Sequence, residues 1–138
     1  MPPVPPPRAT LGGFMWLPRL LAKARLLQSE KLPADYAARF CSPGGVDDQF
    51  LHFFGLSKEA ILTLAALPDE EVIPWFQMHA AGQSLTAEDW NHCAVNLGKE
   101  GFPMAERLPV AVATAYQHLK SQNLQTVFEV LEADEGLS

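Results

Sequence analysis

Prolines and glycines divide this chain into short segments, and this division limits what the chain can fold into. The 138 residues include 12 prolines and 9 glycines, and five of the prolines fall within the first seven residues. Proline bends or ends a helix, and glycine commonly follows a helix end. The spacing therefore predicts a series of short helices packed irregularly, and it excludes a long four-helix bundle.

Apolar residues recur at helical spacing in most of these segments. No stretch of four or more residues alternates apolar and polar side chains with β-branched enrichment, so we expect no strands. The predicted fold is all-α, a single domain of six or seven short helices with no sheet. The domain is expected over residues 11–138, preceded by a proline-rich extended arm over 1–10. Helix starts are expected at these residues: Pro18, Asp47, Ser57, Asp69, Thr86, Pro103 and Leu124.

Composition favours a soluble domain with its own core. Hydrophobic residues make up 48% of the chain, yet no run of 18 apolar residues exists, so we expect no membrane span. The first residues lack the apolar stretch of a secretory signal. The two cysteines, Cys41 and Cys93, are then expected as free thiols in a reducing compartment. The expected location is cytoplasmic.

Charge is unevenly distributed along the chain. Residues 1–39 hold six basic and two acidic side chains, a balance of +4, and the remaining residues hold four basic and 14 acidic ones, a balance of −10, which together give −6. An acidic protein of this kind binds polyanions poorly, so no nucleic-acid partner is expected. The cationic third is either a recognition surface for an anion or packs against the acidic remainder and is neutralised by it.

The first expected helix, over residues 18–29, carries the best candidates for ligand contact. Its core-facing stripe contains Leu17, Leu20, Leu21, Ala24 and Leu27, which places Arg19 and Lys23 on the opposite face. Arginine offers a planar set of donors that fits carboxylate or phosphate, and an indole can stack on a cation or a flat ligand. The candidate ligand-binding residues are Trp16, Arg19, Lys23 and Arg25. The alternative is a solvated helix face that pairs with acidic segments such as 69–71.

Two carboxylate–histidine pairs at helical i, i+4 spacing form a candidate metal site. Asp48 with His52, and Glu88 with His92, would supply four nitrogen and oxygen ligands if the fold brought them together. The alternative is that both are surface pairs. Cys41 is a candidate nucleophile, although the nearby Asp47 and Asp48 are expected to raise its pKa. No resident cofactor is expected.

Sequence motifs for catalysis are missing. The chain contains no phosphate-binding glycine loop, dinucleotide fingerprint, G-x-S-x-G, H-E-x-x-H or C-x-x-C. The expectation therefore leans against an enzyme.

Several segments, in order along nearly the whole chain, resemble one known family. They are Leu11-Gly12-Gly13-Phe14, Trp16-Leu17-Pro18-Arg19, Lys23-Ala24-Arg25, Asp48-Gln49-Phe50-Leu51, Asp69-Glu70-Glu71-Val72 and the run 127–136. The sequence is similar to a bacterial domain-of-unknown-function family, number fifty sixty-nine. The resemblance implies a bacterial, cytoplasmic, mainly helical protein and carries no assigned activity.

Three functional hypotheses follow from the sequence. The first is a non-enzymatic interaction or adaptor module that binds a protein partner or self-associates through the arm and the first helix. The second is a binding domain for a small anionic ligand that uses the basic first helix. The third is a metal-dependent or thiol enzyme built on the candidate metal residues or on Cys41.

Overall fold

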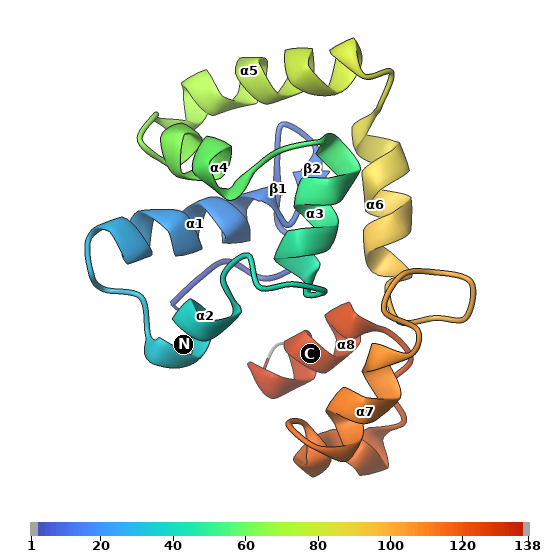
Figure 1. Ribbon diagram of the computed structural model, residues 1–138. Helices are drawn as coiled ribbons and strands as arrows, with labels where there is room; N and C mark the ends of the chain where they lie inside the picture. Colours follow the sequence, from blue (N-terminus) through green and yellow to red (C-terminus); the bar gives the residue numbers. More distant parts are fainter. Residues whose placement is uncertain (1–2, 137–138) are drawn as a thin grey trace.

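The computed structural model describes residues 3–136, which fold into eight α-helices, one 3-10 helix and one small hairpin (Figure 1). The elements are β1 (Thr10–Leu11), β2 (Phe14–Met15), α1 (Leu17–Gln28), α2 (Ala34–Arg39), α3 (Val46–Phe54), α4 (Lys58–Ala65), α5 (Asp69–Gly82), α6 (Ala87–Val95), α7 (Arg107–Ala113), η1 (Gln117–Gln122) and α8 (Val127–Asp134). The largely helical class predicted from the sequence is confirmed. The expected count of six or seven helices is too low.

The prediction of no sheet is wrong in one place. β1 and β2 pair antiparallel, with Thr10 opposite Met15 and Leu11 opposite Phe14. The turn between them consists of Gly12 and Gly13, both at positive φ, which glycine adopts without steric cost. Strands of two residues are too short to show alternation, so the hairpin leaves no strand pattern in the sequence.

The helix starts follow the expected capping residues in part. Thr86 and Asp89 form a reciprocal capping box at α6, and the Ser57 hydroxyl accepts a hydrogen bond from the backbone of α4, as predicted. Asp47 and Asp69 do not cap their helices, because Gly45 and Pro68 take the N-cap positions. Asp47 instead lies in the first turn of α3, where its side chain turns to other partners.

Aromatic side chains from several elements fill the centre of the fold. Phe50 and Phe54 on α3 contact Phe76 on α5 and Trp90 on α6, and Phe14 of the hairpin packs on Phe54 and Phe76 with ring centroids 5.6 and 4.9 Å apart. Edge-to-face and tilted pairs of this kind add to the stabilisation that burial gives. Figure 1 shows α3 in the middle, α5 across one end and α7 with α8 at the other.

The last third of the chain is more broken than expected. Pro109 falls inside α7, which ends at Ala113, and a separate 3-10 helix follows after Tyr116. α8 begins after Thr126, whose hydroxyl accepts from Glu129, and not at Leu124. Within residues 3–136 no helix has the length and apolar character needed to cross a membrane.

The described part of the proline-rich arm packs against the domain. Val4 and Pro7 are buried, and Arg8 forms an ion pair of 2.9 Å with Glu132 of α8. The Pro5 carbonyl accepts a hydrogen bond from Arg19. The arm therefore contributes contacts at the junction between α1 and α8.

Candidate ligand-binding cavity

A cavity of about 370 Å³ lies between the N-terminal helices and the C-terminal pair α7 and α8. Its walls come from the start of α1, from α2, from the loop before α3, and from α7 and α8. The volume falls within the range of about 300–1,000 Å³ that is typical of small-molecule sites. Its lining includes a buried charged group around Trp16, Arg19, Lys23, Asp47 and Glu135, here called the charged side, and its apolar residues come mainly from α7 and α8.

Trp16 forms the floor of the charged side. It precedes α1 in a left-handed conformation with φ 73°, which is uncommon for a residue with a large side chain. Its indole stacks on Phe128 of α8 at a centroid distance of 5.5 Å, and its N–H donates to Asp47 at 2.7 Å. The guanidinium carbon of Arg19 and the ammonium of Lys23 lie 5.1 and 4.8 Å from the ring centroid. The indole is thus held between an aromatic ring and two cations.

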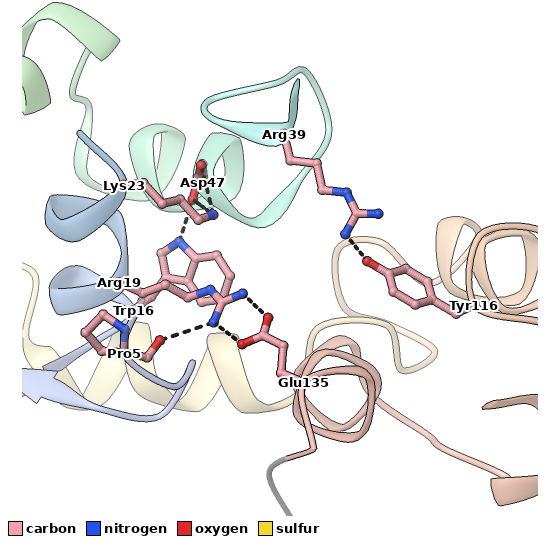
Figure 2. A network of polar contacts seen from close by, with 8 residues as sticks. All are labelled: Pro5, Trp16, Arg19, Lys23, Arg39, Asp47, Tyr116 and Glu135. Atoms are coloured by element: carbon pink, nitrogen blue, oxygen red, sulfur yellow. Dashed lines mark hydrogen bonds and ion pairs between the residues drawn. The ribbon is translucent and has the colours of Figure 1, made fainter. Parts of the chain in front are cut away.

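Lys23 and Asp47 form a buried ion pair beside this indole (Figure 2). The Lys23 ammonium lies 3.2 and 3.4 Å from the two carboxylate oxygens of Asp47, and both residues are at most 5% exposed. The backbone N–H of Cys41 donates to the same carboxylate at 2.9 Å. Burial lowers the pKa of Lys23, and the Asp47 carboxylate opposes that shift.

Arg19 and Glu135 form a second buried ion pair, which joins the first helix to the end of the last (Figure 2). The two Nη atoms of Arg19 donate to the two carboxylate oxygens of Glu135, a bidentate arrangement, and Nη1 also donates to the Pro5 carbonyl at 3.1 Å. The side chains are 2% and 8% exposed. Arg19 Nε is buried and has no hydrogen-bond partner within residues 3–136, so the donor capacity of this guanidinium is not filled.

Two further arginines line the cavity nearer its mouth. Arg39, at the end of α2, donates to the hydroxyl of Tyr116, and Arg107, at the start of α7, donates to the Pro43 carbonyl at 2.9 Å. Both side chains are exposed. In the described part of the chain neither guanidinium lies within 4.0 Å of a carboxylate. Within residues 3–136 these two cations therefore take part in no direct ion pair.

Apolar side chains from α7 and α8 also line the cavity, and are here called the apolar wall. α7 contributes Leu108 and Ala111, and α8 contributes Val130 and Leu131. Tyr36 and Tyr116 also line the cavity, and burial raises the pKa of both phenols, which keeps their hydroxyls protonated as hydrogen-bond donors. The lining thus offers both apolar contacts and hydrogen-bond donors to a ligand.

Three of the four candidate ligand-binding residues meet in this cavity. Trp16, Arg19 and Lys23 line it, and Arg19 and Lys23, which the sequence places on the face opposite the core-facing stripe, are buried in ion pairs with Glu135 and Asp47. Arg25 lies elsewhere: it donates to the carbonyls of Ala65 and Leu67 and pairs with Asp69 at 2.9 Å. Arg25 thus fits the alternative of pairing with the acidic segment.

The candidate metal residues are not gathered into one site. His52 lies 3.3 Å from its own Asp48 and is largely exposed, while Glu88 is exposed and His92 packs on the ring of Phe102. Within residues 3–136 no group of three His, Cys, Asp or Glu side chains is placed to hold a metal ion.

The candidate nucleophile Cys41 is a free thiol whose pKa is raised to about 12, by burial first and then by Asp47. At neutral pH it is therefore protonated and a weak nucleophile.

Sequence reasoning missed several residues of the cavity. Asp47 was expected to cap a helix, and Glu135 was noted only within the C-terminal run. Arg39 and Arg107 belong to short helices with no distinctive motif. These residues come from distant parts of the chain, so only the tertiary fold brings them together. The one signal in the sequence was the cationic balance of residues 1–39, which indicated an anion-binding or self-neutralised region.

The comparisons with known proteins identify a family and no activity. No curated protein and no solved structure matches the chain. The model of one family matches residues 2–137, which is nearly the whole chain, and its description is "Domain of unknown function (DUF5069)". The resemblance seen in the sequence is thereby confirmed: the chain belongs to the DUF5069 family.

Proposed function

We propose that this protein binds a small organic anion with an apolar body in the cavity between α1 and α7–α8. One observation carries the proposal: the cavity gathers four cationic side chains from three helices, and two of them, Arg39 and Arg107, have no carboxylate within 4.0 Å in the described part of the chain. A guanidinium is the side chain best suited to a planar or tetrahedral oxyanion. An organic anion would supply the missing partner.

The charge balance of the cavity favours a ligand of low charge. Four acidic residues also line it: Asp35, Asp47, Asp134 and Glu135. Four cations and four anions produce no strong positive field, so a polyanion would gain little from entering. Recognition would depend on directed N–H donors and on the apolar wall. A monoanion with an aliphatic or aromatic body fits both.

The two other hypotheses find less support in the cavity. The thiol enzyme of the third hypothesis needs a reactive thiolate, whereas the Cys41 thiol is held protonated. The interaction hypothesis assigns the arm to a partner, but Pro5 already binds Arg19 and Val4 is buried. Deleting residues 1–10 would therefore alter the cavity as well as any docking surface.

A fluorescent anion tests the proposal directly. The probe is 8-anilinonaphthalene-1-sulfonate, which has one sulfonate and an apolar ring system, titrated into the native protein. We expect saturable binding at one site, and an affinity about tenfold weaker in the double variant Arg39→Gln/Arg107→Gln. A charge-assisted hydrogen bond contributes about 1.5–3 kcal/mol when it is buried, and less when the side chain is exposed.

The matched control removes the same charge elsewhere. Lys99→Gln/Lys120→Gln lowers the net charge by two, and neither lysine lines the cavity. Its affinity for the probe should stay within about twofold of the wild type. Circular dichroism of each variant checks that the fold persists. Absence of saturable binding, or an equal loss in both double variants, would contradict the proposal.

A further inference from the structure

We propose that the ligand of this cavity is a carboxylate, and that its carboxylate group replaces Glu135 at the guanidinium of Arg19. This inference rests on the proposed function, because it identifies the ligand class of the same site.

Arg19 already binds a carboxylate in the geometry that a ligand would use. The two Nη atoms face the two oxygens of Glu135, so the buried end of the cavity is shaped for a planar group with two oxygens. Arg19 is 2% exposed, and the cation would be left uncompensated if Glu135 departed alone. A ligand carboxylate removes that obstacle, because it replaces one ion pair by another of the same kind.

Glu135 is poorly placed to hold this position against a competitor. It caps the C-terminal end of α8, where the free carbonyls of the helix carry partial negative charge and disfavour a carboxylate. Glu132 and Asp134 lie within three residues of it and add like charge. A ligand carboxylate at Arg19 would meet the same charges, so the advantage of the ligand lies in the burial of its apolar body, which Glu135 lacks. Glu135 and the exposed Gly136, which adopts a positive φ, form the turn that follows α8.

The surroundings of the Arg19–Glu135 pair suit an aliphatic or aromatic acid. Val130 and Leu131 lie on α8, the helix that ends just before Glu135, and both line the cavity. Leu108 on α7 also belongs to the apolar wall. The Trp16 indole, whose ring centroid lies 5.1 Å from the Arg19 guanidinium carbon, is itself 2% exposed and supports that cation from below. A carboxylate at Arg19 would place its apolar tail along the apolar wall. The unfilled Arg19 Nε remains open to a further acceptor.

Removing the internal carboxylate provides the test. Isothermal titration of octanoate, with octanamide as the neutral analogue and octanesulfonate as the tetrahedral one, is carried out on the wild type, on Glu135→Gln and on Asp134→Asn. We expect Glu135→Gln to bind octanoate about tenfold more tightly than the wild type and octanamide no more tightly. Asp134→Asn is the matched control: it removes the same charge from the neighbouring cavity residue but leaves Arg19 paired, so octanoate affinity should change by no more than twofold.

A measurement on the wild type does not depend on a variant that folds. Hydrogen exchange is followed with and without octanoate at the backbone N–H groups of Glu135 and Gly136, which donate to Leu131 and Ala133. Displacement of Glu135 predicts faster exchange at these two amides while the amides of α1 and α7 become more protected. Slower exchange at Glu135 and Gly136 would overturn the inference, as would equal gains in affinity for Glu135→Gln and Asp134→Asn.

The two proposals fail in different ways. If neither the sulfonate dye nor octanoate binds to the wild type or to Glu135→Gln, the proposed function fails and this inference with it. If the dye binds and depends on Arg39 and Arg107, but octanoate gains nothing from Glu135→Gln, the cavity is an anion site in which Glu135 is a permanent wall. Tighter binding of octanesulfonate than of octanoate to Glu135→Gln would likewise overturn the carboxylate assignment.

Discussion

Asp47 holds together three groups that the sequence keeps apart. Its carboxylate accepts hydrogen bonds from the Trp16 indole, the Lys23 ammonium and the backbone N–H of Cys41, and it is 2% exposed. A buried carboxylate is stable only when its oxygens are satisfied in this way. Because it fixes the indole and the ammonium at the same time, Asp47 determines the shape of the charged side of the cavity. Asp47 therefore affects ligand binding through the side chains that it positions, without contacting the ligand itself.

The Cys41 thiol makes stability depend on pH in the alkaline range. Its pKa rises from an ordinary value of 9.0 to about 12 in the folded protein, mainly through burial and then through Asp47. Because the folded-state pKa lies above the unfolded one, this contribution to stability is fully present below pH 9 and is lost as the pH rises towards 12. We expect the free energy of unfolding of the wild type, measured by urea denaturation, to fall more steeply between pH 9 and 11 than that of Cys41→Ala.

The control for the alkaline prediction is the other thiol. Burial alone raises the pKa of Cys93, which has no acidic neighbour among the causes of its shift. Cys93→Ala should therefore change the pH slope less than Cys41→Ala does. The lowered pKa of Lys23 has the opposite effect, because it makes the free energy of unfolding rise with pH up to 10.5. This effect is the same in the wild type and in both cysteine variants. Identical slopes for the wild type and Cys41→Ala would contradict the prediction.

At the scale of elements, Gly98 sets how closely α6 approaches the two helices that form the apolar wall. It adopts φ +98°, and a Cβ there would lie 2.9 Å from a methyl carbon of Leu108 and 3.3 Å from Val127. We expect Gly98→Ala to lower the free energy of unfolding by about 2–3 kcal/mol, from backbone strain and overpacking together. Because Leu108 and Val127 line the cavity, binding of the sulfonate dye should weaken as well.

Gly82→Ala is the matched control for this element. Gly82 ends α5 without a positive φ, and a Cβ added there would meet no atom within 4 Å, so alanine should stabilise the fold by about 0.4–1 kcal/mol. Urea denaturation of both variants gives the comparison. If Gly98→Ala did not lower the free energy of unfolding below that of the wild type, the contact between residue 98 and the apolar wall would be looser than the 2.9 Å distance to Leu108 indicates.

The sequence predicts elements where local chemistry decides them. The Thr86–Asp89 capping box, the Ser57 cap and the end of α3 at Gly55 all follow from neighbouring residues, and all agree with the structure. Local chemistry does not predict the hairpin or the burial of Arg19. The hairpin is set by two glycines and by packing of Phe14, and Arg19 is covered by a helix more than 100 residues away. Helical periodicity identifies the apolar face of α1 but not a second face covered by other elements.

At the scale of the whole molecule, the uneven charge of the sequence becomes a set of long-range ion pairs. Four of the six basic residues in 1–39 pair with acidic residues further along the chain, as Arg8–Glu132, Arg19–Glu135, Lys23–Asp47 and Arg25–Asp69. The interpretation that the two regions pack together and neutralise each other is supported for these four. Lys31 and Arg39 form no ion pair within residues 3–136, and Arg39 is the one of the two that lines the cavity. Arg19 and Lys23 belong to both groups, because they form ion pairs within the protein and also line the cavity.

These ion pairs differ in burial, which predicts how much each contributes to the stability of the whole molecule. Lys23→Met leaves the Asp47 carboxylate buried without its cation and should lower the free energy of unfolding by about 3–5 kcal/mol. Arg8→Met breaks a pair whose side chains are 43% and 21% exposed, and should cost about 0–1 kcal/mol. Urea denaturation at pH 7 measures both losses. The double variant Lys23→Met/Asp47→Asn should lose less free energy of unfolding than its two single variants together, because neither charge is then buried without its partner. Equal small losses for Lys23→Met and Arg8→Met would mean that water reaches the Asp47 carboxylate. The charged side of the cavity would then be a solvated surface and not the buried framework on which the proposed anion site depends.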